Sequence, residues 1–410
     1  MQILGGIGRA LAHRNYRLYW ASNGLNTIGR WMYRVAVAWL TWELTESATW
    51  LGIVAFAEIF PLVVFSILAG AIADRIGYVR ITFIAQGATI AAAAVFAGIT
   101  VAGAITIELV LLFASLIGSL EALTTPARMA MVHGLVPKND MAAAIALNSA
   151  TFNAARFVGP GIASALLVWI GTGAVLAIVA LTFAQFWLIL LRIKVNEPER
   201  NPGPWRDLAR DILSGCRYCY CHAGICFLLA MLGVTGLLIR PVIEIMPGIS
   251  VRVFDHGPDG VGILLSSLGF GAMFAGLWLA RRGSAEGLTR LVTDSLLVQG
   301  IALVFAMLAG QIWVSAACLA VVGFFMVVAA IGSQTLIQNA VESEMRARVM
   351  SLFIVISWGL PALGSLMAGW LASLFGFPMV IGTGGALTVL LWVWARPQAS
   401  RHRQALEDAK

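Results

Sequence analysis

The feature that most constrains this chain is a series of apolar blocks, each near the ~20 residues that cross about 30 Å of hydrocarbon as an α-helix. Lipid offers no partners to backbone amides and carbonyls, so each block must satisfy its own hydrogen bonds, as a helix does. We place the blocks at residues 17–42, 49–73, 79–101, 104–125, 141–170, 172–192, 222–247, 258–280, 288–309, 311–334, 347–374 and 377–396. The sequence predicts an all-α integral membrane protein with twelve transmembrane helices.

Composition and charge agree with this class. Apolar residues make up 60% of the chain and charged residues 11%, whereas soluble domains carry about 25% charged residues. With both termini inside, most of the 27 Lys and Arg residues fall in inner segments, and only Arg252 falls in an outer loop. That bias is typical of cytoplasmic loops. We expect a multi-pass protein of the bacterial inner membrane with both termini cytoplasmic, and the net charge of +7 requires no nucleic-acid partner.

The chain also repeats itself at half-length. The sequence GAIADRIG at residues 70–77 has a weaker counterpart, GLWLARRG, at residues 276–283. A parallel repeat of six-span units is expected of a transporter built from two related halves. We predict two pseudo-symmetric six-helix bundles, at 1–193 and 222–396, with a cytoplasmic linker at 194–221 and a cytoplasmic tail at 397–410.

The linker differs in composition from the blocks. Its Pro-rich start at residues 196–204 favours neither helix nor strand. Trp205, Leu208, Ile212 and Leu213 then follow at helical spacing with charged residues between them, which predicts an amphipathic helix on the inner membrane surface.

Cys216, Cys219, Cys221 and His222 lie close together after this helix. Their spacing is compatible with a soft metal ion, or with reduced thiols at the membrane surface. One cluster on one helix does not easily converge four ligands, so we predict no metal site.

The strongest local motif is Gly70-x-x-x-Asp74-Arg75-x-Gly77-x-x-Arg80, between the second and third blocks. Its glycines permit a tight turn and close helix approach. The motif resembles the signature loop of the major facilitator superfamily. In that family the loop's Asp contacts the start of the eleventh helix and holds the cytoplasmic side shut. The resemblance implies this gating role for Asp74, with Arg75 and Arg80 as partners; alternatively, Asp74 only fixes the local turn.

Further motifs narrow the resemblance to one branch. They are RNYRLYW at 14–20, GRWM at 29–32, WLTWELT at 39–45, PAR at 126–128, LVP at 135–137, ALNS at 146–149 and the run from Asn153 to Pro160. They resemble the twelve-span drug:proton antiporter branch that includes the enterobactin exporter and macrolide efflux proteins. The resemblance covers the amino-terminal half well and the other half loosely, and it implies efflux coupled to protons.

Ionisable residues inside the blocks are the best candidates for a site, because charge at membrane depth is costly and usually functional. Arg30 and Arg34 lie about 20 and 26 Å along the helix from Arg17, at 1.5 Å per residue. They share one helical face with Asn23 and Thr27. We expect this polar stripe to face a central cavity.

Two other blocks carry charge at a similar depth. Arg156 and Asn153 form a second stripe, and Glu58 lies roughly 24 Å along its helix from Asp74. We predict that Glu58 pairs with one of the arginines and that the surplus positive charge faces the cavity. Burial and a neighbouring arginine act in opposite directions on a carboxylate's proton affinity. The alternatives are a static structural salt bridge and Glu121, closer to the inner mouth, as the proton site.

Arg240 and Glu244 are four residues apart near the outer end of the seventh block. Beside two prolines, they are candidates for a pair of outer gate residues.

Together these features predict a secondary active exporter of an amphipathic or anionic small molecule, such as a drug or siderophore, driven by proton antiport. Its partners would be the substrate, protons and the bilayer, it would act as a monomer, and it would need no cofactor beyond the proton gradient. A G-x-x-x-x-G-K-[ST] loop for ATP is missing. A proton-coupled importer remains open. A membrane enzyme is disfavoured, since neither H-E-x-x-H nor G-x-S-x-G occurs.

Overall fold

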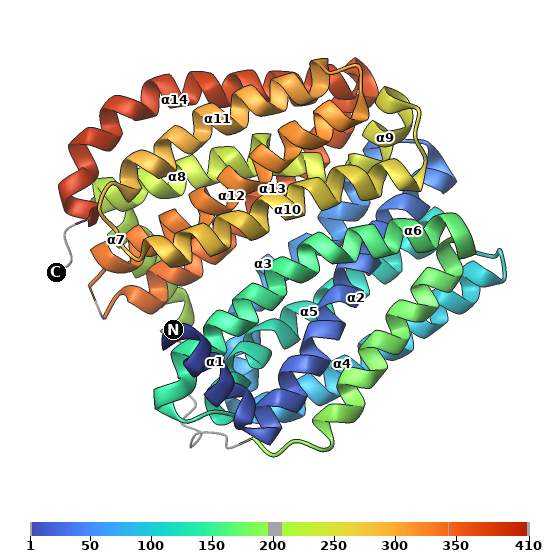
Figure 1. The fold of residues 1–410 in the computed structure, drawn as a ribbon, viewed down its shortest axis with the longest axis horizontal. Coiled ribbons are helices and arrows are strands. Elements are labelled where there is room, and N and C mark those ends of the chain that lie inside the picture. Colours follow the sequence, from blue (N-terminus) through green and yellow to red (C-terminus); the bar gives the residue numbers. More distant parts are fainter. Residues whose placement is uncertain (1, 196–206, 343, 408–410) are drawn as a thin grey trace. The chain divides into compact units, whose positions relative to one another are not determined.

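The protein is helical throughout the described part of the chain. The computed structural model describes residues 2–195, 207–342 and 344–407 (Figure 1). Residues 1–45 and 57–203 form one compact unit, and residues 46–56 and 204–410 form a second. The beginning of the predicted linker, residues 196–206, lies outside the described residues.

In the first unit, long helices pack side by side. They are α1 (Gln2–Ala12), α2 (Arg14–Thr45), the later part of α3 (Ala48–Ile76), α4 (Tyr78–Val101), α5 (Ile107–Met131) and α6 (Met141–Leu190). Helix α2 packs along α6, and α4 packs against both α5 and α6. The contact between α2 and α6 is tight because glycines line it: a Cβ built on Gly29 would overlap Thr182, and one built on Gly159 would lie 2.6 Å from the Cβ of Trp31.

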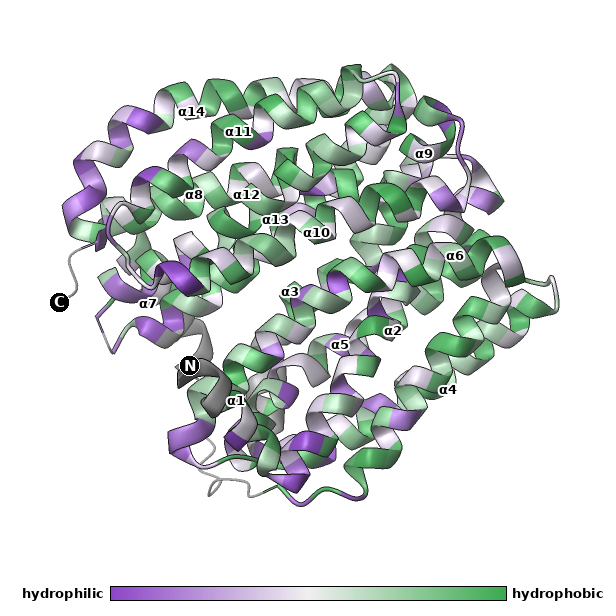
Figure 2. Ribbon diagram, in the orientation of Figure 1, coloured by the Kyte–Doolittle hydropathy of each residue, from purple (hydrophilic) through white to green (hydrophobic). Residues whose placement is uncertain are grey.

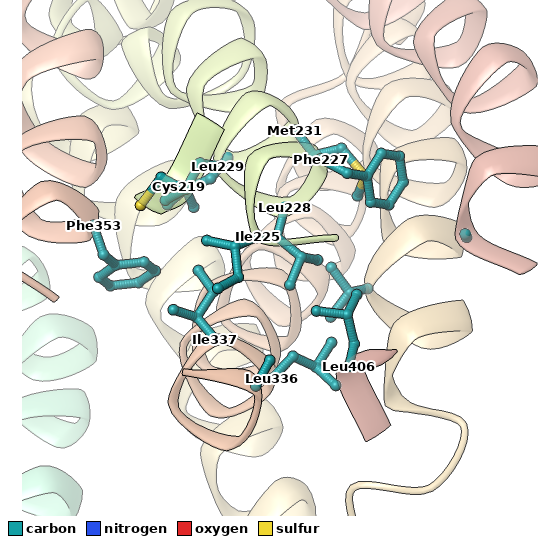
Figure 3. Close-up of a cluster of buried hydrophobic side chains, with 14 of the residues drawn as sticks. Cys219, Ile225, Phe227, Leu228, Leu229, Met231, Leu336, Ile337, Phe353 and Leu406 are labelled. Atoms are coloured by element: carbon teal, nitrogen blue, oxygen red, sulfur yellow. The ribbon is translucent and has the colours of Figure 1, made fainter. Parts of the chain in front are cut away.

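The second unit repeats this kind of packing. Its helices are α7 (Asp207–Cys221), α8 (Ala223–Leu238), α9 (Met246–Phe254), α10 (Pro258–Arg282), α11 (Leu288–Leu308), α12 (Ile312–Ala340), α13 (Arg346–Phe375) and α14 (Phe377–Glu407). Figure 3 shows Ile225, Leu228, Leu336 and Ile337 in the apolar core at one end of this unit, all of them fully buried. Helix α7 begins in the segment where we predict the amphipathic helix.

Hydropathy follows the pattern expected for helices in lipid. Figure 2 shows hydrophobic residues along the lengths of the helices, with hydrophilic residues gathered mainly at their ends. Large apolar side chains such as Trp169 and Leu390 are exposed, which an apolar solvent permits. Among the described residues, ten helices are long and apolar enough to cross a membrane.

Two features account for the difference between these ten helices and the predicted twelve spans. The stretch Lys138–Leu190 counts once, although Gly171 interrupts α6 with φ 75° and ψ 169°, between the predicted fifth and sixth spans. Helix α2 is 32 residues long but lies outside the set of ten, and Arg30 and Arg34 make its centre polar. The prediction of twelve spans therefore remains a prediction.

The end of the chain is more ordered than a free tail would be. Helix α14 continues past Arg396, where we expected the tail to begin, as far as Glu407. The Glu407 carboxylate accepts hydrogen bonds from the backbone N–H groups of Gly287 (2.7 Å) and Thr289 (3.0 Å) at the start of α11. A carboxylate at a helix N-terminus is favourable because it satisfies free amides and the helix dipole. The last turns of the tail are thereby docked on the second unit.

The bend at Gly171 gives a testable prediction. Its backbone lies in a region that only glycine adopts readily, so Gly171→Ala should destabilise the protein by about 1–3 kcal/mol. A Cβ added at this position would lie in open space, with nothing within 4 Å, so strain in the backbone is the only expected cause. Thermal unfolding in nanodiscs measures it.

Gly98→Ala is the matched control, because its Cβ would also meet nothing within 4 Å and Gly98 lies inside helix α4. It should leave the melting temperature unchanged or raise it. Equal melting temperatures for Gly171→Ala and wild type would contradict the prediction.

Candidate functional site

A single carboxylate oxygen joins two arginines in the interior of the first unit. Oε2 of Glu121, on α5, lies 2.8 Å from Nη2 of Arg30 on α2 and 2.9 Å from Nη2 of Arg128 on α5. The side chain of Arg128 is 7% exposed and that of Glu121 is 13% exposed. At this depth neither charge is solvated by bulk water, so each depends on the others for stabilisation.

A second ion pair lies between α2 and α3. Nε of Arg34 is 3.7 Å from Oε1 of Glu58. Glu58 reaches this position because α3 and α5 are in close contact beside it. A Cβ built on Gly118 would overlap the backbone carbonyl oxygen of Glu58, so only glycine fits there.

Trp31 is flanked by two guanidinium groups. The Cζ atoms of Arg34 and Arg156 lie 5.4 and 5.7 Å from the centroid of its ring. Both distances are within the range of cation–π attraction. The ring also meets Phe152 edge-on at 6.1 Å. The aromatic ring therefore holds Arg156, on α6, near the ion pair of Arg34.

These contacts define what we call the arginine–glutamate cluster. Its members are Arg30, Arg34, Arg128, Arg156, Glu58 and Glu121. The pairing that we expected for Glu58 is present, with Arg34 as its partner. Glu121, which we placed closer to the inner mouth than Arg30, is nevertheless bonded to it, because both side chains are long enough to bridge a difference in depth. Arginines outnumber carboxylates in the cluster, which favours an anionic or electron-rich ligand group.

The polar stripe residues are less involved. The hydroxyl of Thr27 donates to the carbonyl of Asn23 at 2.7 Å, and the amide of Asn153 donates to the carbonyl of Ser149 at 2.9 Å. Both bonds lie within a single helix, so the donors of these two residues serve their own backbone. Helical spacing places them near the arginines without bonding them to the cluster.

The signature loop is described only in part. Gly77 is the one residue between α3 and α4, and its φ of 102° explains why glycine stands there. Arg75 is partly buried and Arg80 is exposed. The side chain of Asp74 lies outside the described part of the structure, so the gating role stays a prediction.

The candidate outer gate has a different local structure from the one expected. Helix α8 ends at Leu238, and Arg240–Ile243 form a 3₁₀ turn, so Arg240 and Glu244 are not related by α-helical i,i+4 spacing. Nη1 of Arg240 donates to the carbonyl of Ser357 on α13 at 2.6 Å, and its Cζ lies 5.2 Å from the ring centroid of Trp358. Arg240 thus ties the turn to α13.

The cysteines near the start of α8 are free thiols, not disulfides. No group of three or more His, Cys, Asp or Glu side chains that could hold a metal occurs in the described part of the chain. Burial raises the pKa of the Cys219 thiol to about 11, and a metal ligand must be a thiolate. The imidazole of His222 instead accepts the backbone N–H of Ile225 and caps α8.

Sequence reasoning missed two residues of this region, Arg128 and Trp31, and gave no attention to Tyr33, which lies between Arg30 and Arg34 on α2. Arg128 is seven residues from Glu121, two helical turns along the same face, and that spacing was a usable signal. Trp31 and Tyr33 stand beside Arg30 and Arg34, but an aromatic residue in an apolar block carries no distinct signal of its own.

Comparison with known proteins decides the family. The family model described as "Transmembrane secretion effector" matches residues 9–404. This chain belongs to that family, within the major facilitator superfamily. The predicted membership is confirmed, and the protein is a multi-pass membrane transporter rather than an enzyme.

Two curated relatives and one solved structure illustrate the likeness. The chain is 27% identical over 386 residues to the staphyloferrin A transporter of Staphylococcus aureus, covering 92% of this chain and 94% of the relative. It is 25% identical to macrolide efflux protein A of Streptococcus pyogenes, covering 81% and 83%. A mutant of the peptide transporter POT in complex with sulfate superposes with a TM-score of 0.78 at 12% identity, covering 98% and 99%. The last likeness concerns the fold alone.

The geometry of the cluster predicts a role for Glu121 in stability. Glu121→Gln should destabilise the transporter by about 3 kcal/mol, because it leaves two arginines without their shared counter-charge in a buried site. Unfolding in nanodiscs, followed by tryptophan fluorescence, measures the loss. Wild-type stability of Glu121→Gln would contradict this role.

Proposed function

We propose that this protein is a secondary active exporter of the bacterial inner membrane, which moves an amphipathic or anionic small molecule out of the cell by proton antiport. In this proposal it has twelve spans in two six-helix bundles, both termini are cytoplasmic, it acts as a monomer, and the proton gradient is its only energy source. In this proposal, alternating access carries the substrate across.

The observation that carries the proposal is the arginine–glutamate cluster in helices that belong to an efflux transporter family. Ionisable groups within membrane-spanning segments are costly and mark substrate and proton pathways. Glu58 and Glu121 are the carboxylates in this cluster, and each is held by arginine at 3.7 Å or less. A carboxylate that exchanges arginine partners also changes its affinity for a proton.

Antiport requires that substrate and proton exclude each other. A substrate that donates a hydrogen bond or brings a positive charge to Glu58 or Glu121 binds best when the carboxylate is ionised. A proton arriving from outside neutralises the same carboxylate and releases the substrate. An amphipathic molecule with an amine or hydroxyl donor fits this sequence of events. The relatives named for macrolide efflux and staphyloferrin A transport supply two probes of different charge.

The excess of arginine favours a second candidate, the proton-coupled importer of an anion. An anion that takes the guanidinium of Arg34 competes with its ion pair to Glu58, and the carboxylate then gains affinity for a proton. Anion and proton would therefore bind together and move in the same direction. The two candidates differ in one measurable quantity, which is the direction in which protons move relative to the substrate.

The relative direction of proton and substrate movement is the test. In everted vesicles with an acidic lumen, adding a macrolide or staphyloferrin A should release protons from the lumen as the probe accumulates there. Binding of an antiported probe should tighten as pH rises through the range in which Glu58 and Glu121 ionise, because only the ionised carboxylate accepts it. Binding that tightens as pH falls, with protons and probe moving in one direction, would favour the importer.

Two variants assign the proton site. If Glu58 carries the coupled proton, Glu58→Gln should abolish the pH dependence of probe binding while Glu121→Gln keeps it. The reverse result moves the coupling to Glu121. Probe transport without any linked proton flux, in the wild type, would contradict proton coupling altogether.

The signature loop gives a separate prediction. Asp74→Asn removes the charge that the gating role requires but keeps the size of the side chain, so transport should fall at least tenfold while expression and membrane insertion are unchanged. Arg80→Gln, on an exposed side chain of the same loop, is the companion variant and should cause a smaller loss. Full activity of Asp74→Asn in vesicle transport would overturn the gating role.

A further inference from the structure

Tyr33 is a buried residue of the first unit whose hydroxyl has no evident structural use. Its side chain lies on α2 between Arg30 and Arg34, and the residue is 3% exposed. Oη is buried and makes no hydrogen bond to any described residue. A buried polar group without a partner is unfavourable, and a phenylalanine would fill the same space without that cost. The hydroxyl therefore calls for an explanation.

The ring of Tyr33 is held in place by aromatic neighbours. It meets Phe96 on α4 edge-on, with centroids 6.5 Å apart and an interplanar angle of 74°. Phe96 in turn stacks on Phe113 of α5 at 4.9 Å. Phe96 is fully buried and Phe113 nearly so. These contacts fix the direction of the hydroxyl, so its position is a property of the packed core.

Tyr33 stands on α2 between the two arginines that hold the carboxylates of the cluster. Arg30 bonds Glu121 of α5, and Arg34 pairs with Glu58 of α3; α3 and α5 come together at the glycine contact of Gly118. Glu121 binds its two arginines through Oε2, and its other oxygen, Oε1, is buried without a hydrogen-bond partner in the described residues. A buried donor on Tyr33 and a buried acceptor on Glu121, neither of them hydrogen-bonded, thus occur beside the same ion pair of Arg30 with Glu121.

We propose that Tyr33 is a proton relay between Glu58 and Glu121. In the transfer, protonated Glu58 gives its proton to Oη of Tyr33 while the hydroxyl passes its own proton to Oε1 of Glu121. One O–H bond breaks on Glu58 and one on Tyr33, and one forms on Tyr33 and one on Glu121. Tyr33 is neutral before and after, and the net change is one proton moved from one carboxyl group to the other.

The proton transfer changes how strongly each carboxylate holds the arginines around it. The charged groups that contact the two carboxylates are Arg30 and Arg34 on α2 and Arg128 on α5, and Arg156 on α6 lies against the Trp31 ring beside Arg34. A proton on Glu58 weakens its hold on Arg34, and a proton on Glu121 weakens its hold on Arg30 and Arg128. Moving the proton therefore changes which arginine is available to a substrate. The relay rests on the proposed function, because only a proton-coupled transporter needs it.

The test separates the rate of proton transfer from the affinity for protons. Purified transporter in nanodiscs is taken through a rapid drop in pH, and protonation of its carboxyl groups is followed by time-resolved infrared spectroscopy of their carbonyl stretch. Glu58→Gln and Glu121→Gln assign the two signals. In Tyr33→Phe, protonation of one of the two carboxylates should slow at least tenfold. Its equilibrium titration midpoint should stay the same, because the hydroxyl bonds neither carboxylate in this structure.

Tyr19→Phe is the matched control. It removes the same atom from the same helix, but the Tyr19 hydroxyl donates to the carbonyl of Arg128 at 3.0 Å, so this variant should melt at a lower temperature and keep the wild-type protonation rates. Tyr33→Phe should melt no lower than wild type. Wild-type rates in Tyr33→Phe would overturn the relay, and so would a shift of both titration midpoints, which indicates a structural role.

The failure of the relay and the failure of the proposed function give different results. Proton-linked export in vesicles together with unchanged protonation rates in Tyr33→Phe removes the relay and leaves the exporter. Slowed protonation in Tyr33→Phe without substrate-linked proton flux keeps the proton exchange between Glu58 and Glu121 but removes antiport.

Discussion

The pairing of charges inside the first unit is the constraint on which the rest of this structure depends. An arginine or glutamate at membrane depth is tolerated only with a partner of opposite charge or strong hydrogen bonds. Glu121 satisfies two arginines with one oxygen atom, at 2.8 and 2.9 Å. Because Arg30 and Glu121 lie on different helices, the ion pair links α2 to α5. Removing Glu121 would leave Arg30 and Arg128 without the carboxylate that they share.

Glycine makes that pairing possible. A carboxylate side chain is short, so helices that carry the partners must come close together. Where Gly118 meets the carbonyl of Glu58, and where Gly159 meets Trp31, any side chain would force the helices apart. Separation there would weaken the ion pair of Arg34 with Glu58 and the contact of Arg156 with Trp31. In lipid, small residues are the usual means of close helix approach, and here they also determine the geometry of the charges.

Much of the fold could be predicted from sequence because the membrane leaves few alternatives. Apolar length predicted helices, and the boundary between the fifth and sixth blocks fell at Gly171, where α6 changes direction. Helical depth predicted that Glu58 pairs with an arginine. It could not identify Arg34 as the partner, since Arg30 and Arg34 differ by one turn and the lateral order of the helices is not encoded in any single block.

Two other features could not be predicted from the sequence, each because of its local structure. Counting residues placed Glu121 and Arg30 at different depths, but side-chain length and helix tilt contribute as much as the count. The spacing of Arg240 and Glu244 assumed an α-helix, whereas Pro241, directly after Arg240, favours a 3₁₀ turn.

The distribution of charge differs between segments of the two units. The arginine–glutamate cluster belongs to the first unit, whereas the apolar block 311–334 of the second contains no charged residue. In the proposed exporter, the fixed charges of the cluster would select for a polar group on the substrate, and uncharged segments such as 311–334 would select for hydrophobic surface. Together they would favour an amphipathic molecule without requiring a detailed pocket for any one compound.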